Sequence, residues 1–364
     1  MIVLKKWNFS FLLSSFLFFG FLSYYGCTFD KNKINSTSDS PVQERKQRGV
    51  HVFGRIDSSS FQPLIKNNVE WITYVPWGHQ ENYDSPSVEG GPSLDSLRFM
   101  RRDSSLRNRI TLAHEAGLKV FLKPHIWIYR PTDGTWRSDI FPTNDENWEA
   151  WKTSYRDFIL YYAQVAEEYK IEMFCVGTEF TRLTIEKPEY WKKLIQDVRN
   201  IYSGKITYAA NWYKEFEKIT FWDQLDYIGI QAYFPLVKNK NPTVKEISKG
   251  WKKYFSSIKR IHKKFNKKIL FTELGYKSME ESAIEPWKWV DYESDLEQIT
   301  VSTETQVNCY QAFFDTVWEK NWMAGVHLWQ WRAEHENTGG LQNVDFTPQN
   351  KPAEDVIGKG FGKK

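Results

Sequence analysis

Two glutamates occupy the same kind of position in the chain. Glu179 follows the apolar run Met173–Thr178, and Glu273 follows the apolar run Ile269–Thr272. A carboxylate at the end of a buried strand is costly to remove from water unless a cavity, a partner or a substrate receives it. Each glutamate alone could be a solvated strand end or an ion-pair partner. Because the pattern occurs twice, it predicts a paired-carboxylate active site.

The rest of the chain alternates between short apolar runs and helical patterns. Near-continuous apolar strands that alternate with helices indicate a parallel sheet covered on both faces. Eight such runs predict an α/β fold, a closed (β/α)₈ TIM barrel in a single domain, whose active site lies where the strands end. The expected strands cover 49–53, 71–75, 119–125, 173–179, 205–211, 227–235, 269–276 and 325–331, and helical spacing occurs within 106–116, 148–169, 189–198, 243–265 and 307–318.

Polar and aromatic side chains end most of these runs. Aromatic residues make up 17% of the chain, with 17 tryptophans, more than a core requires, so we expect some to line a binding surface. Acids, amides and tryptophans at one rim suit a glycan, whose C–H faces stack on aromatic rings. Two long connections, 78–100 and 277–305, either shape a cleft or decorate the surface. The predicted rim comprises Trp77, His79, His125, Trp127, Glu179, Asn211, Trp212, Gln231, Tyr233, Glu273, Trp329 and Trp331, with Trp287 and Trp289 on the second connection.

The N-terminus has the pattern of an export signal. Lys5 and Lys6 precede an apolar run that ends at Tyr25, and Gly26 precedes Cys27. This pattern predicts a signal peptide over residues 1–27 with Cys27 as a lipidated cysteine; a plain signal peptide or a membrane anchor are the alternatives. Residues 28–48 are polar, and this composition predicts a disordered tether. The catalytic domain is then 49–364, on an exported cell-envelope lipoprotein, periplasmic or at the cell surface, or otherwise secreted.

Composition limits the partners. The net charge of +4 does not indicate a nucleic-acid partner, and the stretch Lys263–Lys268 reads as the solvated end of a helix. Cys175 and Cys309 could form a disulfide, although nothing requires one. No spacing of His and Cys resembles a metal site, so we expect no metal and no cofactor. We expect a monomer that meets the membrane only through its N-terminal anchor.

Two carboxylates on either side of a glycosidic bond can hydrolyse it, by retention or by inversion. The ends of the fourth and seventh strands are where clan A glycoside hydrolases carry such a pair, and within that clan the chain resembles glycoside hydrolase family 113, the β-mannanases. The resemblance covers the whole domain. It is carried by four segments, Val176–Phe180, Gly229–Pro235, Phe271–Tyr276 and Phe346–Ala353.

The resemblance implies a role for several residues. Glu179 would be the acid/base and Glu273 the nucleophile of a retaining enzyme, with Tyr233 bonded to Glu273. Trp331 would form the floor of the subsite where cleavage occurs. Thr178 stands where most of the clan has an asparagine that holds the sugar 2-hydroxyl. Either Asn211 or His125 makes that contact here, or the hydroxyl is bound less tightly. The substrate would be β-1,4-mannan, a manno-oligosaccharide or a related β-linked glycan.

Alternatives stay open for the supporting residues and for the function. Tyr233 and Trp331 could be core aromatics, Asn211 could form a turn, and His79 and His125 could be satisfied polar residues. The chain could also be a non-catalytic glycan-binding surface lipoprotein on a TIM-barrel scaffold, although a binder has no need of both acids. A metal-dependent hydrolase is disfavoured because the strand ends are not rich in histidine.

Overall fold

The computed structural model describes residues 45–92, 96–132, 134–289 and 299–363. Contacts divide the chain into residues 1–43 and the unit Glu44–Lys364, and every described residue belongs to the second unit. The predicted signal segment, Cys27 and most of the predicted tether therefore lie outside the described residues. None of the described helices is long and apolar enough to span a bilayer.

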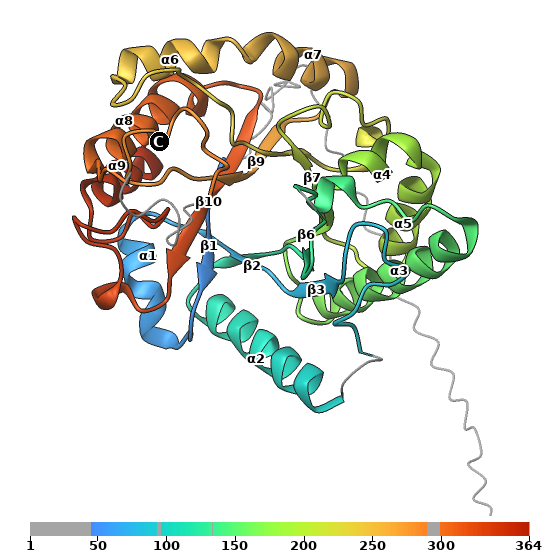
Figure 1. The fold of residues 1–364 in the computed structure, drawn as a ribbon. Coiled ribbons are helices and arrows are strands. Elements are labelled where there is room, and N and C mark those ends of the chain that lie inside the picture. Colours follow the sequence, from blue (N-terminus) through green and yellow to red (C-terminus); the bar gives the residue numbers. More distant parts are fainter. Residues whose placement is uncertain (1–44, 93–95, 133, 290–298, 364) are drawn as a thin grey trace, which may run out of the picture. The chain divides into compact units, whose positions relative to one another are not determined.

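Eight parallel strands close into a barrel, and each expected apolar run supplies one of them. Figure 1 shows the helices as an outer ring around these strands. The prediction of a (β/α)₈ barrel is confirmed. Around the ring the strands are β1 (Gln47–Phe53), β2 (Trp71–Tyr74), β4 (Lys119–Leu122), β6 (Met173–Thr178), β7 (Lys205–Asn211), β8 (Ile228–Gln231), β9 (Ile269–Leu274) and β10 (Met323–Arg332).

The helices begin where local sequence favours them. Asn144 accepts a hydrogen bond from the Asn147 amide at the start of α3, and Thr243 forms a capping box with Glu246 at the start of α6. Pro188 opens α5, as predicted. The α-helices are α1 (Gln62–Lys66), α2 (Ser96–Glu115), α3 (Asp145–Glu168), α4 (Thr181–Glu186), α5 (Pro188–Arg199), α6 (Val244–Lys252), α7 (Phe255–Phe265), α8 (Thr303–Phe313), continued by a π-helical turn (Phe314–Trp318), and α9 (Pro352–Gly362).

A second, two-stranded sheet extends one side of the barrel rim. The expected strand over 119–125 stops at Leu122 and resumes as β5 (His125–Ile128), which pairs with β3 (Trp77–Gln80). Both breaks contain a proline: Pro76 lies between β2 and β3, and Pro124 lies between β4 and β5. Because proline has no N–H to donate, neither residue adds a donor here, although the Lys123 amide still donates to the Tyr74 carbonyl and the His125 amide to the Pro76 carbonyl. The small sheet carries Trp77 and His125 above the barrel.

The barrel begins earlier than the expected boundary at Gly49, because β1 already includes Gln47 and Arg48. The Arg48 guanidinium donates to the Glu70 carboxylate and to the Phe361 carbonyl, the latter at 2.6 Å. Arg48 is 6% exposed. Because the buried Arg48 guanidinium has both of these partners, it helps to fix β1 to the C-terminal helix, which contains Phe361.

Most tryptophans of the described residues fall into two groups. Seven line a single cavity, whereas six others are fully buried. Most of the buried ones pack helices onto the outside of the barrel; Trp151 of α3 and Trp191 of α5, for example, both contact Tyr155. The fully buried group is Trp151, Trp191, Trp222, Trp251, Trp322 and Trp331.

Candidate active site

A cavity of about 770 Å³ opens where the barrel strands end. Glu179, directly after β6, and Glu273, in β9, both line it. The paired carboxylates predicted from sequence therefore share one cavity. The complete lining is Trp77, His125, Trp127, Gly134, Trp136, Arg137, Glu179, Asn211, Trp212, Tyr213, Gln231, Tyr233, Glu273, Trp287, Lys288, Trp289, Trp329 and Phe346.

Twelve of the fourteen side chains predicted for the rim and its second connection lie on this lining; Trp331 does not. Thr178, which the resemblance singled out, does not line the cavity either. His79, which the rim prediction also included, lies apart from the cavity and stacks on Tyr129, with ring centroids 5.2 Å apart. The twelve that line the cavity are Trp77, His125, Trp127, Glu179, Asn211, Trp212, Gln231, Tyr233, Glu273, Trp287, Trp289 and Trp329.

Glu273 is held by a buried cation and a phenol. The Lys123 ammonium lies 2.5 Å from Oε1, and the Tyr233 hydroxyl donates to Oε2 at 2.8 Å. Lys123 also donates to Gln231 Oε1 at 2.8 Å, and Glu273 is only 5% exposed. Burial lowers the pKa of Lys123, and the adjacent Glu273 carboxylate opposes that shift. The carboxylate is thus fixed in orientation, with its negative charge compensated inside the protein.

His125 lies beside Glu273 and Arg137 as a neutral imidazole. Burial, together with the charges of Lys123 and Arg137, keeps the pKa of His125 well below its ordinary value. Arg137 Nη1 donates to His125 Nδ1 at 2.9 Å, so the ring proton resides on Nε2. Nε2 lies 3.6 Å from Glu273 Oε1 and has no hydrogen-bond partner among the described residues. This N–H is therefore a buried donor without a partner, on a residue that lines the cavity.

A second neutral histidine supports Lys123 from the barrel interior. His51 Nδ1 lies 3.2 Å from the Leu328 carbonyl oxygen, which requires a proton on Nδ1. Nε2 is then an acceptor, 3.4 Å from the Lys123 ammonium. Burial, with the charge of Lys123, holds the pKa of His51 well below its ordinary value. His51 therefore orients the cation that orients Glu273.

Glu179 has the opposite environment. Burial raises the pKa of the Glu179 carboxyl, the Arg137 guanidinium lowers it, and the charge of Glu273 raises it further. Arg137 Nε lies 3.7 Å from Glu179 Oε2. The net direction is upward, so Glu179 holds its proton to a higher pH than an ordinary carboxyl group, whereas Glu273 has the Lys123 ammonium beside it. Two carboxyl groups whose environments differ in this way are suited to opposite roles in proton transfer.

The backbone at Glu179 is in a conformation that few non-glycine residues adopt. Its φ is +56°, in the left-handed region. Hydrogen bonds fix the peptides on both sides, because the Glu179 amide donates to the Ala209 carbonyl at 2.9 Å and the Phe180 amide donates to the Tyr208 hydroxyl at 2.7 Å. Strained residues of this kind persist where the surroundings over-determine them, and they concentrate at functional sites.

Glu215, which is fully buried, anchors this support. Its Oε1 accepts from the Tyr208 hydroxyl at 2.6 Å and from Thr184 at 2.9 Å. Its Oε2 accepts from the Asn211 amide at 2.7 Å and from Thr181 at 3.1 Å. Burial raises the pKa of Glu215 to about 7, against hydrogen bonds that lower it. Glu215 does not line the cavity; it connects the end of β7 to the helix that follows Glu179.

Asn211 combines the two roles considered from sequence. Its Oδ1 accepts from the Tyr213 amide at 2.9 Å, which makes it a turn former. It also lines the cavity. The aromatic wall beyond it includes Trp212 stacked on Trp287, with centroids 5.2 Å apart. Trp287 is 40% exposed, as an outer binding surface requires.

The expectation that Trp331 forms the cavity floor is wrong. Trp331 is 1% exposed and packs near His335, whereas Trp329 lines the cavity. The cause is a bulge, because β10 has one residue more than β1 between the pairs Val50–Leu328 and Val52–Trp331. One extra residue reverses the alternation of side chains, so the two tryptophans do not point the same way.

Thr178 is also absent from the lining. It is 1% exposed at the end of β6. It therefore does not take the place of the asparagine that most of the clan has there. The two substitutes considered for that contact, Asn211 and His125, both line the cavity.

Lys123 and Arg137 were not identified from sequence. Lys123 follows the apolar run that ends at Leu122, so its position at a strand end was a usable signal. Arg137 lies in a short 3-10 helix (Arg137–Asp139) on the connection after β5, where no periodicity marks it. No cluster of potential metal ligands occurs among the described residues.

Comparison with known proteins places this arrangement in a family. The sequence profile of Glycoside Hydrolase Family 113 matches residues 48–351. The chain belongs to Glycoside Hydrolase Family 113. The resemblance carried by the segments around Glu179 and Glu273 is thereby confirmed, and this family member is a glycosidase. No curated protein matches the chain.

Solved structures agree with the family assignment. A structure described as a complex of a GH113 β-1,4-mannanase is 26% identical, with a TM-score of 0.73, covering 88% of this chain and 99% of its own. The GH113 β-mannanase of Alicyclobacillus acidocaldarius in complex with ManMIm is 28% identical, with a TM-score of 0.71, covering 87% and 97%. A Ruminococcus gnavus β-glucuronidase, 14% identical with a TM-score of 0.56, covers 87% of this family 113 chain and 50% of its own, and shares the fold alone.

Proposed function

We propose that this chain is a retaining β-mannanase that hydrolyses β-1,4-mannan or manno-oligosaccharides by double displacement. The observation that carries the proposal is the contrast between the two carboxyl groups of the cavity. Glu273 has a buried ammonium at 2.5 Å, whereas burial raises the pKa of Glu179. A retaining glycosidase needs this contrast, an ionised nucleophile opposite a protonated acid.

In the first step, a Glu273 oxygen attacks the anomeric carbon while the glycosidic C–O bond breaks. Glu179 gives its proton to the departing oxygen. In the second step, a water gives a proton to the Glu179 carboxylate, and its oxygen attacks the same carbon and releases Glu273. The Tyr233 hydroxyl donates to Glu273 Oε2 at 2.8 Å, and the Lys123 ammonium donates to Glu273 Oε1. These two contacts hold the carboxylate in one orientation.

Recognition of the sugar at the cleavage site is assigned to Trp329, Asn211 and His125. Trp329 lines the cavity and is 7% exposed, so its ring offers a floor for a pyranose. Aromatic contacts of this kind contribute on the order of 1 kcal/mol. The Asn211 amide nitrogen and His125 Nε2 are the donors left for sugar hydroxyls, since Asn211 Oδ1 and His125 Nδ1 are already bonded. The axial 2-hydroxyl of mannose is the contact that we assign to one of them.

Outer subsites are assigned to the exposed aromatics. Trp127, Tyr213, Trp287 and Trp289 are between 40% and 56% exposed around the cavity. Rings with one face in water bind successive sugars of a chain more readily than a single small molecule. Solved family members described as β-mannanases support the choice of mannan.

Product analysis tests the substrate. The purified chain is incubated with oligosaccharides of mannan, glucomannan, xylan and cellulose, with Glu273→Gln as the inactive control. We expect release of manno-oligosaccharides from mannan and glucomannan, and none with the control. Equal or faster cleavage of the xylan or cellulose oligosaccharides would overturn the assignment to mannan.

We also propose that the enzyme is exported and attached to the cell envelope through a lipid on Cys27. The apolar run before Gly26 and Cys27 supports this location. Labelling with a radioactive fatty acid in cells tests it, with Cys27→Ser as the control. Labelling that is equal in both proteins would count against Cys27.

A further inference from the structure

Positive charge is concentrated in one segment of the chain. Residues 238–268 hold 12 of the 49 lysines and arginines but only one of the 45 acidic residues, Glu246. This segment therefore carries +11, and the remainder of the chain carries −7 within the net +4. The lysine-rich stretch Lys263–Lys268 is one part of this segment, and the structure brings the charges of α6 and α7 together.

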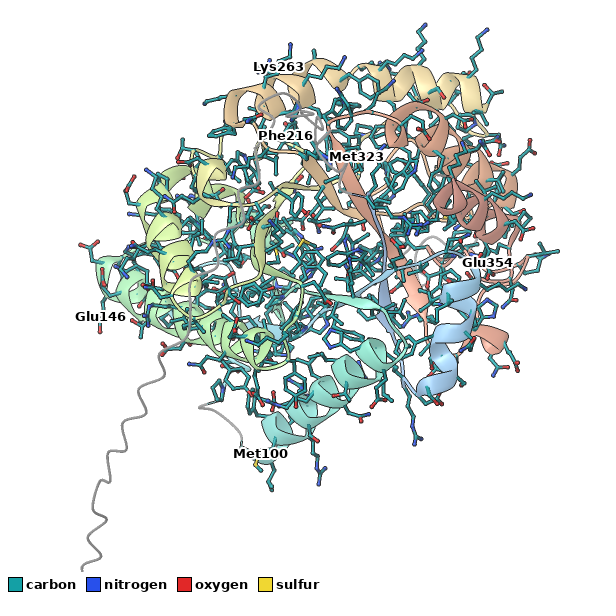
Figure 2. The ribbon with its side chains drawn as sticks, turned by 180° about the vertical axis from the view of Figure 1, so that it is seen from behind. Met100, Glu146, Phe216, Lys263, Met323 and Glu354 are labelled. Carbon is teal, nitrogen blue, oxygen red and sulfur yellow. The ribbon has the colours of Figure 1, made fainter. Side chains whose placement is uncertain are left out.

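These lysines form one outward face of two consecutive helices. Ile247 and Trp251 of α6, and Ile258 and Ile261 of α7, are buried against the barrel, which leaves the lysines on the opposite side. In Figure 2 the side chains of α6 and α7, with Lys263 labelled, extend away from the barrel. We call the exposed members the basic face: Lys245, Lys249, Lys252, Lys253, Lys259, Lys263 and Lys264.

The basic face lacks internal counter-charges. Lys240 pairs with Glu281 and Arg260 pairs with Glu217, but both lie outside the basic face as defined. None of its seven lysines has an ion-pair partner among the described residues. Glu246 is engaged with Thr243 in the cap of α6. Unpaired like charges on one face repel one another, so an anionic surface that neutralised them would be attracted to it.

The chemistry of the basic face suits a lipid bilayer. Arg260 is the one arginine of α6 and α7, and it is paired with Glu217. The unpaired members are lysines, which act as point charges toward a diffuse anionic surface, whereas arginine is favoured where a single phosphate or base is recognised in a fixed geometry. The start of the described chain lies near α7. The Lys46 ammonium lies 5.5 Å from the centre of the Trp318 ring, and the Lys320 ammonium lies 5.6 Å from the ring of Phe255, the first residue of α7. The described chain therefore begins close to the helix that carries part of the basic face.

We propose that the basic face binds the anionic headgroups of a phospholipid bilayer and holds the barrel side-on to the membrane. No residue of α6 or α7 lines the cavity, so binding would leave the cavity open. The contact is independent of a lipid on Cys27 and would act as a second membrane signal beside it. It departs from the expectation that the protein meets the membrane only through its N-terminal anchor.

Vesicle sedimentation of the full chain tests the proposal. The probes are vesicles of phosphatidylcholine with a quarter phosphatidylglycerol, and vesicles of phosphatidylcholine alone, each at low and high salt. The test variant carries K249E, K252E and K263E; the matched control carries three reversals at exposed sites elsewhere, K66E, R101E and K359E. The apolar run before Cys27 is the same in the wild type and both variants, so its contribution to vesicle binding does not affect the comparison between them.

We expect the test variant to partition onto the anionic vesicles about a hundredfold more weakly than the wild type at low salt. The control should match the wild type, and high salt should remove the difference because it screens exposed charges. Hydrolysis of a soluble oligosaccharide should be unchanged in both variants. Equal partitioning of all three proteins would overturn the proposal. So would binding of the wild type to DNA or to an acidic polysaccharide that is as tight as to the vesicles.

Discussion

Arg137 is expected to set the pH at which the acid step fails. Its guanidinium Nε lies 3.7 Å from Glu179 Oε2, and both side chains are mostly buried, at 8% and 13% exposed. Arg137 stabilises the ionised form of Glu179 and so lowers a pKa that burial raises. Arg137→Met removes this charge with little loss of volume, whereas Arg137→Lys keeps it. Removal should therefore raise the pKa of Glu179.

The size of the shift follows from the distance. At about 4 Å and an effective dielectric constant near 20, two unit charges interact by about 4 kcal/mol. Neighbouring opposite charges at such distances shift carboxyl pKa values by about one to three units. Because Glu179 must be protonated to release the leaving group, activity is lost as the pH rises through its pKa. The alkaline limb of kcat/KM should thus move upward by about one to three pH units in Arg137→Met.

The pH profile of kcat/KM on a manno-oligosaccharide measures this shift. The Arg137→Lys variant should keep its alkaline limb near that of the wild type. A substrate with an activated aryl leaving group needs no proton, so its first step should not show the limb at all. An alkaline limb that stays in place or moves downward in Arg137→Met would refute the reasoning, and with it the role of Glu179 as the acid.

Three further predictions address the supporting residues. Lys123→Met should abolish activity at neutral pH and lower the free energy of unfolding by about 3–5 kcal/mol, because Glu273 loses its buried partner; Lys123→Arg is the control, and retained turnover in Lys123→Met would contradict the assignment. Trp329→Ala should lower kcat/KM sharply, whereas Trp331→Ala should cost about 3–5 kcal/mol in unfolding free energy and leave kcat/KM of the folded enzyme near the wild-type value; the opposite kinetic pattern would restore Trp331 to the site. Glu215→Gln places an amide N–H₂ opposite backbone and hydroxyl donors, so the free energy of unfolding in urea should fall by about 1–3 kcal/mol. The value of kcat should fall by a larger factor than KM rises, and unchanged stability and kinetics would exclude a positioning role for Glu215.

The barrel was predictable because its strands are buried on both faces. Runs such as Met173–Thr178 and Ile269–Leu274 are apolar at nearly every position, and no solvent-facing alternation hides them. The breaks at Pro76 and Pro124 were less visible. The sequence shows that each proline lacks a donor. Only the pairing of β3 with β5 shows that both breaks fall at the same level and start a second sheet.

The catalytic pair was predictable because the fold brings all strand ends to one rim. The failure at Trp331 has a local cause, since a one-residue bulge in β10 changes which tryptophan faces the cavity, and no residue type in the strand marks that bulge. Lys123 was overlooked because a lysine at a strand end is usually solvated, and only its contact with Glu273 shows otherwise. Arg137 could not be found, because its position depends on the path of a connection.

The stereochemistry of the first product tests the central claim most directly. Proton nuclear magnetic resonance during the first minutes of hydrolysis of a β-linked manno-oligosaccharide, before the anomers equilibrate, reports the configuration at the cleaved carbon. Attack by Glu273 followed by attack of water inverts that carbon twice, so the β-anomer should appear first and the α-anomer only later by mutarotation. Initial formation of the α-anomer would contradict the account, because it would mean that water attacks directly and that Glu273 forms no bond to the sugar.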